Sequence, residues 1–319
     1  MIPARPARRS LTRWFCLAVS GLTALAFAGM VALFAFESLP VWRHAGFEYL
    51  RGHQWFFRAQ RFGALPMVYG TLAVSALALL LAAPVGLGSA VFVAEILPAR
   101  LRLPAKTAIE LLAGIPSVVY GLLGVLLLRG WMLRVLAPFE PLSGDTLATG
   151  GVLLAVMILP TVVTLGDDAL RGVARSQRQA ARALGLTRAE TIVRVSLPQA
   201  LPGLVAALLL ALGRALGETI AVFLVIGRQD NQWPEHLLSP ASLAAAGQTL
   251  TTKLGGSETH IAYGDPLHWA AMVALALVLA ILVASVTLAG TWLGRPRLAG
   301  AASANLPSPV GGDPGDPHA

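Results

Sequence analysis

Two ionisable side chains, Arg214 and Glu218, lie near the middle of a long apolar stretch that includes ALGRALGETIAV at residues 211–222. A charge at the centre of a membrane costs about 2.5–3.5 kcal/mol on insertion scales, so such residues usually face a protein interior or a wet path. In a continuous helix over 199–227, Arg214 lies roughly 22 Å from the inner end and Glu218 roughly 6 Å further out. The spacing predicts two charges deep in the membrane, one helical turn apart.

The chemistry that this pair offers is oxyanion binding. Arginine presents a planar, permanently charged guanidinium that binds oxyanions through paired hydrogen bonds. We expect Arg214 to contact a small anion and Glu218 to hold the guanidinium when no anion is present. In the simpler interpretation the two charges neutralise each other and lock a helix bundle, although base before acid is the less favourable order within a helix. Gly213 and Gly217 form a G-x-x-x-G pattern on an adjacent row, which predicts close packing against a neighbouring helix.

Six long apolar segments must position these residues. The chain has 319 residues, of which 56% are hydrophobic and 13% charged, and this composition is far from that of a soluble domain. Each segment is long enough to cross the hydrocarbon core as a helix. The segments are 14–36, 67–96, 107–128, 146–165, 199–227 and 267–293. The sequence therefore predicts an all-α membrane protein with six transmembrane helices.

The distribution of lysine and arginine predicts the orientation of these helices. With the N-terminus inside, the inner segments carry 15 basic residues, the outer segments carry eight, and Arg214 is left over. The positive-inside rule then places both termini in the cytoplasm. The net charge of +8 is thus mostly a topology signal rather than a sign of nucleic-acid binding. A cleavable signal peptide is the alternative for the first segment, but its apolar run continues well past the possible cleavage site.

The same pattern divides the chain into domains. Residues 1–13 form a cytoplasmic N-terminus, 14–36 the first transmembrane helix, 67–293 a five-helix transmembrane domain, and 298–319 a disordered tail rich in Pro, Gly and Ala. Within the domain, 170–197 is an inner loop and 228–266 an outer loop. Proline is expected to kink the second helix at Pro84 and the third at Pro116. Glu95, near an inner helix end, is expected to pair locally with Arg100, Arg102 or Lys106.

The inner loop contains signals for two short helices. Four arginines recur at spacings of four, three and four residues, which places them on one helix face. Gly185 suits the end of that helix. Thr187 and Glu190 form a T-x-x-E capping box that starts a second helix, and Pro198 marks the turn into the membrane. A helix-turn-helix elbow is the predicted structure, and a solvated connector is the simpler interpretation.

This loop resembles the permease subunits of ABC importers, in which Glu-Ala-Ala is followed by three residues, Gly, nine residues and Ile-x-Leu-Pro. The matching positions here run from Gln179 to Gly185 and from Val195 to Pro198. Gln179 stands where the family usually has Glu, and this removes a charge. The resemblance implies a type I importer permease fold and a coupling helix that sits in a groove of the ATP-hydrolysing subunit. The residues that would shape this coupling helix are Gln179, Ala180, Ala181, Gly185, Leu197 and Pro198.

Two further stretches narrow the resemblance. ALGRALGETIAVFLVIG in the fifth segment and GIPSVVYG at 114–121 look like the phosphate-specific ABC importer, and its PstC-type permease in particular. The companion PstA-type permease generally carries a proline soon after Gly-Glu-Thr, where this chain has Ile220-Ala221-Val222. The resemblance covers about residues 67–293 and associates Arg214 and Glu218 with the phosphate pathway.

The resemblance also implies partners and a location. The partners are a PstA-type permease, two ATPase subunits and an extracytoplasmic phosphate-binding protein, in a bacterial inner membrane. ATP and Mg would bind to the ATPase subunits, and this chain is expected to hold no cofactor or metal, since it lacks a Walker A loop and H-E-x-x-H. Sulfate or molybdate is an alternative substrate. An ATP-independent transporter or channel is a less favoured reading, and an intramembrane enzyme is the least favoured, because no nucleophile or metal set accompanies the charged pair.

Overall fold

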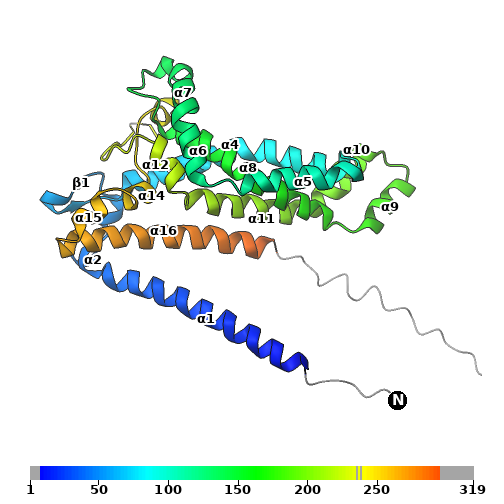
Figure 1. The fold of residues 1–319 in the computed structure, drawn as a ribbon, viewed down its shortest axis with the longest axis horizontal. Coiled ribbons are helices and arrows are strands. Elements are labelled where there is room, and N and C mark those ends of the chain that lie inside the picture. Colours follow the sequence, from blue (N-terminus) through cyan, green and yellow to red (C-terminus); the bar gives the residue numbers. More distant parts are fainter. Residues whose placement is uncertain (1–7, 235, 238, 295–319) are drawn as a thin grey trace, which may run out of the picture.

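The computed structural model describes residues 8–234, 236–237 and 239–294, and most of these residues are helical (Figure 1). The long helices are α1 (Arg8–Glu37), α4 (Leu65–Val91), α5 (Ala99–Ala113), α8 (Leu147–Arg171), α11 (Leu197–Leu216) and α16 (Pro266–Leu293). The short helices are α2 (Leu39–Ala45), α3 (Glu48–Arg51), α6 (Ser117–Leu123), α7 (Arg129–Val135), α9 (Arg175–Ala183), α10 (Arg188–Thr191), α12 (Ile220–Val225), α13 (Pro240–Leu243), α14 (Leu250–Leu254) and α15 (Glu258–Ala262). Single π-turns occur at Phe92–Ile96, Gly124–Leu128 and Ile192–Ser196, and 3-10 turns at Phe57–Ala59 and Ala137–Phe139. Strands β1 (Trp55–Phe56) and β2 (Arg61–Phe62) form a small antiparallel hairpin.

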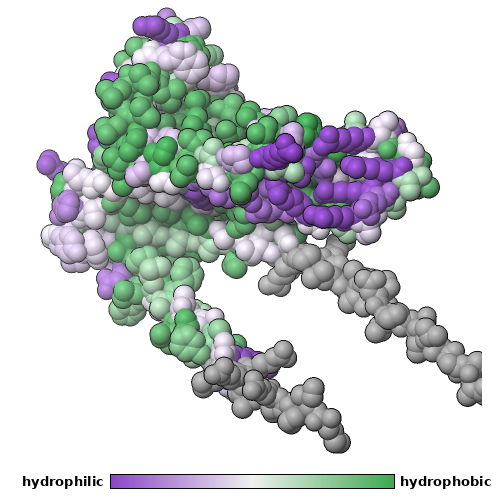
Figure 2. Space-filling view, turned by 45° about the vertical axis from the view of Figure 1, so that its right-hand side comes forward, coloured by the Kyte–Doolittle hydropathy of each residue, from purple (hydrophilic) through white to green (hydrophobic). Residues whose placement is uncertain are grey.

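Six helical stretches of the described residues are long and apolar enough to cross a membrane, which confirms the predicted fold class. They are Thr12–Glu37, Leu65–Ile96, Ser117–Val135, Leu147–Arg171, Arg188–Leu216 and Pro266–Leu293. Their flanks form a largely hydrophobic surface, while hydrophilic side chains gather at the end that carries α9 and α10 (Figure 2). The predicted tail at 298–319 and residues 1–7 of the predicted N-terminal segment 1–13 lie outside the described residues.

The predicted bounds of the third span are wrong. The sequence predicts a kinked helix over 107–128, but α5 ends at Ala113 and α6 begins at Ser117. Pro116 lacks an amide proton, so it suits the start of a new helix, and the residue before it disfavours helical geometry. The membrane-spanning stretch therefore runs from Ser117 to Val135. Pro84, in contrast, lies inside α4, which continues through it.

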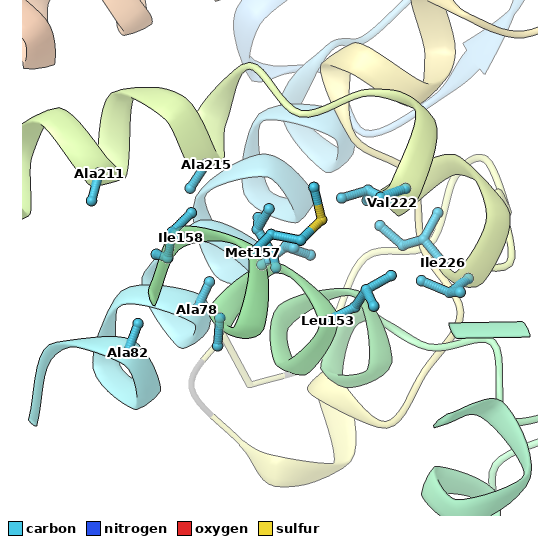
Figure 3. Packing of buried hydrophobic residues seen from close by; sticks show 14 of the residues in the cluster. Ala78, Ala82, Leu153, Met157, Ile158, Ala211, Ala215, Val222 and Ile226 are labelled. Atoms are coloured by element: carbon cyan, nitrogen blue, oxygen red, sulfur yellow. The ribbon is translucent and has the colours of Figure 1, made fainter. Parts of the chain in front are cut away.

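The centre of the bundle is the contact between α4 and α8, where glycines allow close approach. A Cβ at Gly86 would come within 2.6 Å of Val162, and a Cβ at Gly151 within 2.6 Å of Leu77. Helices in membranes associate largely by such close packing of small residues. The buried core that results draws side chains from α4, α8, α11 and α12, several of which are labelled in Figure 3.

The two ends of the molecule differ. At one end α2, α3, the hairpin and α15 pack around a second buried cluster, in which Tyr49 donates a 2.8 Å hydrogen bond to the carbonyl oxygen of Ala271 in α16. At the other end lie α9, α10 and the C-terminal end of α16 (Figure 1). Helix α1 packs against α16 and α2, then diverges from α16 toward its own N-terminus (Figure 1). No residue of its most apolar window is buried, so α1 offers most of its surface to lipid or to another subunit.

Candidate functional site

The apolar stretch that carries the charged pair is two helices rather than one. Helix α11 ends at Leu216, Gly217 caps it, and α12 begins at Ile220. The expectation of a continuous helix over 199–227 is therefore wrong. Side chains on both sides of the break enter the same core, including Ala215 before it and Val222 after it (Figure 3).

The break is stable in an apolar setting because other groups satisfy its backbone. Thr251 of α14 donates a 2.9 Å hydrogen bond to the Glu218 carbonyl oxygen. The Glu218 carboxylate accepts a hydrogen bond of 3.4 Å from the amide of Ala221, in the first turn of α12. Interrupted helices occur at membrane depth where neighbouring side chains supply hydrogen bonds in this way. A segment of the outer loop thus reaches into the bundle and holds the break.

Arg214 lies in the last turn of α11, where the helix dipole favours a positive charge. Its side chain is exposed in the isolated chain, and its Nη1 donates a 3.0 Å hydrogen bond to Oγ1 of Thr161 in α8. The described residues contain no ion pair between Arg214 and Glu218, so the expected clamp between them is not formed. The reason is the break, which gives Glu218 a backbone partner in α12 instead.

The two glycines of the G-x-x-x-G pattern have different surroundings. A Cβ at Gly213 would come within 2.8 Å of Oγ1 of Thr287, so this buried glycine permits the close approach of α11 and α16. A Cβ at Gly217 would meet nothing nearer than carbonyl oxygens of its own turn at 3.8 Å. The pattern therefore does not act as one packing row, because the helix ends between its two members.

Several hydroxyl groups near the break were not singled out from the sequence. The amide of Leu250 donates a 2.9 Å hydrogen bond to Oγ1 of Thr71 in α4, and Thr249 lies buried beside it. With Thr251 these threonines line a small hollow beside Glu218, whereas Thr161 contacts Arg214. Threonine is common in apolar helices and carries no charge, so hydropathy gives no signal for this arrangement.

The inner loop folds as the predicted elbow. Helix α9 is followed by Gly185 in the left-handed region, at φ +85°. Oγ1 of Thr187 accepts a hydrogen bond from the Glu190 amide, and the Glu190 carboxylate accepts one of 2.9 Å from the Thr187 amide, which completes the capping box.

The six residues assigned to the coupling helix fall on different surfaces. Gln179 and Ala180 of α9 are exposed, as is Gly185, whereas Ala181 is buried and Leu197 is half-buried. Pro198 lies in the first turn of α11, and a π-turn over Ile192–Ser196 joins α10 directly to α11. The chain does not turn into the membrane at Pro198 as expected, because the helical span already begins at Arg188.

Glu95 has a partner that the sequence did not indicate. Its Oε1 lies 3.1 Å from Nη2 of Arg178 in α9, and its carboxylate is buried. The expected local pair with Arg100, Arg102 or Lys106 does not form. Lys106 instead contacts Asp168 of α8 at 2.7 Å. Both contacts fasten the inner end of the bundle to segments distant in the sequence.

A second buried charged group lies at the opposite end. Nζ of Lys253 is 2.6 Å from Oδ2 of Asp230 and also contacts Glu258, whose other oxygen accepts from His268 at 2.9 Å. Burial of the Glu258 carboxyl opposes ionisation, but the hydrogen bonds from Lys253, Trp55 and His268 prevail and lower its pKa. No group of three or more His, Cys, Asp or Glu residues that could hold a metal is present in the described part of the chain.

The fold and this site define a class of protein: a membrane-embedded permease with an interrupted helix and an elbow of two short helices at one end of the bundle. Residues 82–297 match the family model for the binding-protein-dependent transport system inner membrane component. The chain belongs to this family, and within it to the PstC-type permeases.

Individual relatives agree with this assignment. The chain is 36% identical over 253 residues to the phosphate transport system permease protein PstC of Mesorhizobium japonicum, covering 74% of this chain and 75% of the relative. It is also 36% identical to the protein of the same name from Pasteurella multocida, covering 75% and 78%. Among solved structures, a chain of a bacterial alginate ABC transporter has the same fold, with a TM-score of 0.54 and 16% identity over 91% of this chain and 98% of that one.

Proposed function

We propose that this chain is the permease subunit through which an ABC importer passes inorganic phosphate into the cytoplasm. The relatives named above are phosphate transport permeases, and the chemistry of the interrupted helix suits a small oxyanion. In this proposal Arg214 contacts phosphate, and Thr161 positions the guanidinium. Glu218 shapes the pathway by holding the first turn of α12 at the break.

The single observation that carries the proposal is the state of Arg214. Its guanidinium is exposed on the bundle surface, hydrogen-bonded to a neutral threonine and free of any carboxylate among the described residues. An arginine in an apolar setting is costly unless it meets an anion or water. A second permease subunit placed against this face would enclose a path in which Arg214 supplies the positive charge.

The assembly follows from the same surfaces. We infer that a PstA-type subunit covers the exposed face of α11, and that an extracytoplasmic phosphate-binding protein docks at the end formed by α2, the hairpin and α13–α15. One of the two ATPase subunits of the assembly would bind the elbow of this chain. Both termini would then be cytoplasmic, which the excess of inner arginines supports. ATP and Mg would be held by the ATPase subunits and none by this chain.

The elbow would transmit the motion of the ATPase subunits. Gln179 and Ala180 are exposed on α9, while Ala181 is buried against the rest of the protein. Since α10 continues through a π-turn into α11, a displacement of the elbow acts on the same helix that carries Arg214. This continuity gives ATP hydrolysis a rigid connection to the anion site.

The test is ATP-dependent uptake of labelled phosphate by vesicles that contain this chain with its candidate permease, ATPase and binding-protein partners. We expect uptake that requires ATP and persists in excess sulfate and molybdate. Uptake abolished by sulfate would retain the importer and exclude phosphate as its substrate. Phosphate uptake without ATP would instead indicate a channel or secondary transporter.

A further inference from the structure

A basic hollow lies at the elbow end of the molecule, away from the pathway formed by Arg214. Four arginines and one carboxylate line a cavity of about 540 Å³, and they come from three parts of the chain. The charged lining residues are Glu95, Arg102, Arg178, Arg182 and Arg188. The same end of the molecule shows the dense hydrophilic surface in Figure 2. Four positive charges against one negative charge leave the hollow strongly cationic.

The contacts within the hollow hold three of its arginines in place and neutralise only Arg178. Arg102 donates a 2.7 Å hydrogen bond to the Leu97 carbonyl oxygen, and Arg188 donates to the carbonyl oxygen of Glu95. Arg178 forms an ion pair with Glu95, whose carboxylate is the only one among the residues that line the hollow. Carbonyl oxygens orient a guanidinium but carry no net charge, so each of these arginines keeps donors available for an anion.

Two observations point to a missing ligand. Nε of Arg178 is buried and has no hydrogen-bond partner among the described residues. The side chain of Arg182, in the last turn of α9, is exposed and has no hydrogen bond or ion pair within the same part of the chain. Buried donors are normally satisfied, and neighbouring arginines repel one another unless an anion lies between them.

The position of the hollow relative to the membrane indicates which class of ligand it can bind. Glu95 is in the last turn of the span that ends at Ile96, and Arg188 is the first residue of the span that follows the elbow. Apolar side chains beside these span ends are exposed, among them Phe92, Ile96 and Val193. Basic pockets between helix ends at a membrane surface are suited to phosphate-bearing headgroups, whose acyl chains lie along the flanking apolar surface.

We propose that this arginine hollow binds a phosphate group at the membrane surface and thereby fixes the elbow to the end of α4. An anionic phospholipid headgroup and free inorganic phosphate share this chemistry, and the experiment separates them. The site is distinct from the transport pathway. This inference takes two things from the proposed function, namely the assignment of the leaflet as cytoplasmic and the permease partner used in the experiment. The binding test can fail while transport of phosphate stands.

The experiment uses the full-length chain purified in neutral detergent with its permease partner. Retained lipid is counted by native mass spectrometry, and the unfolding temperature is measured with added phosphatidylglycerol, phosphatidylcholine or inorganic phosphate. The test variants are Arg182→Gln and the double variant Arg102→Gln with Arg182→Gln. The matched control is Arg194→Gln, which removes an exposed arginine from the same inner region but outside the hollow. An added Arg214→Gln substitution removes the pathway contribution to phosphate binding.

We expect the anionic lipid or phosphate, but not phosphatidylcholine, to raise the unfolding temperature of the unaltered chain and of Arg194→Gln. The affinity for the phosphate-bearing ligand should fall about fivefold for Arg182→Gln and about 30-fold for the double variant. These values follow from a contribution of about fivefold for each arginine near an anionic surface. Protection by phosphatidylglycerol alone identifies a lipid site, and protection by inorganic phosphate in the Arg214→Gln background identifies a free-anion site. Equal protection of control and double variant, or protection by neither ligand, overturns the proposal. Arg182→Gln breaks no side-chain hydrogen bond or ion pair within the described residues, so a fold defect does not obscure the result.

Discussion

At the scale of single residues, the arginine at the break is set apart by what it does not contact. A guanidinium has five N–H donors, and in the described chain one donor of Arg214 is used, by Thr161. The neutral partner orients the guanidinium without cancelling its charge. This arrangement suits transient binding, because an anion must both enter the site and leave it.

We therefore expect Arg214→Gln to reduce ATP-dependent phosphate uptake by about 10- to 100-fold, the effect of losing a charged hydrogen bond. The unfolding temperature should change little, since the side chain is exposed and makes one neutral contact. Uptake of labelled phosphate and thermal unfolding in detergent measure the two effects.

Two variants sharpen this result. Arg214→Lys retains the charge and loses the planar pair of donors, so it should recover only part of the uptake. Thr161→Val retains the volume and removes the 3.0 Å hydrogen bond, and it should raise the phosphate concentration needed for half-maximal uptake. Unchanged transport in Arg214→Gln would exclude the arginine from the pathway.

At the scale of elements, contacts between helices decide which small residues matter. Gly213 fits against Thr287 of α16, whereas Gly88 of α4 has no atom within 4 Å of where a Cβ would lie. Both glycines are helical, so a scale of helix propensity treats them alike. The neighbouring helix distinguishes them.

Gly213→Ala should destabilise the protein by about 1–3 kcal/mol, the usual cost of overpacking. Gly88→Ala, its matched control, should be neutral or stabilising by up to about 1 kcal/mol, because alanine favours the helix. Adding Thr287→Ala removes the obstructing hydroxyl and should restore most of the stability of Gly213→Ala. Unfolding temperatures of the four proteins provide the measurement, and an equal effect at both glycines would contradict the packing assigned to α11 and α16.

The elbow offers a similar comparison between neighbouring positions. Ala180→Trp places a large ring on the exposed side of α9, so stability should stay within about 0.5 kcal/mol while ATP-dependent uptake is lost. Ala181→Trp faces inward and should lower the unfolding temperature. Uptake and ATP hydrolysis by the reconstituted assembly, measured beside thermal unfolding, test the pair. Normal uptake by a folded Ala180→Trp assembly would place the ATPase contact elsewhere.

At the scale of the whole molecule, charged groups fasten both ends of the bundle. Lys253 of α14, buried to 2% exposure, contacts Glu258 of α15, and Glu258 reaches α16 through His268. At the other end, Glu95 and Lys106 connect the inner helix ends to α9 and α8. Between these ends the contacts are mostly apolar, apart from hydrogen bonds such as those that Thr161 and Thr251 make around the helix break.

The buried contacts of Glu258 with Lys253 and His268 predict a pH dependence of stability. The pKa of Glu258 is lowered in the folded chain, so its stabilising effect is complete above the ordinary value of 4.5 and is lost as the pH falls below it. Glu258→Gln should cost about 3 kcal/mol at neutral pH, because Lys253 loses one of its two carboxylates. It should also flatten the acid-induced fall of the unfolding temperature relative to the unaltered chain.

The control for this prediction is Glu48→Gln, which removes an exposed carboxylate at the same end of the molecule. Its unfolding temperature should follow that of the unaltered chain from neutral pH to below pH 4.5. A Glu258→Gln protein with the same acid dependence as the unaltered chain would show that this carboxylate does not contribute.

The sequence by itself determined the membrane-spanning class, the number of spans and the elbow with its capping box. These features depend on the length of apolar runs and on hydrogen bonds within a few residues, so short stretches of the sequence are enough to predict them. The family resemblance was likewise carried by short motifs, around Gly185 and around Arg214.

Only the tertiary structure decided how the charged groups are partnered. Glu95 meets Arg178 from the elbow, Arg214 meets Thr161 from another span, and Lys253 of α14 meets Asp230 from an earlier part of the outer loop. The helix break at Gly217 belongs with these contacts, because Thr251 and the packing of α12 against α6 hold it. Such pairings depend on which distant segments pack side by side, and neither hydropathy nor spacing along the chain encodes that choice.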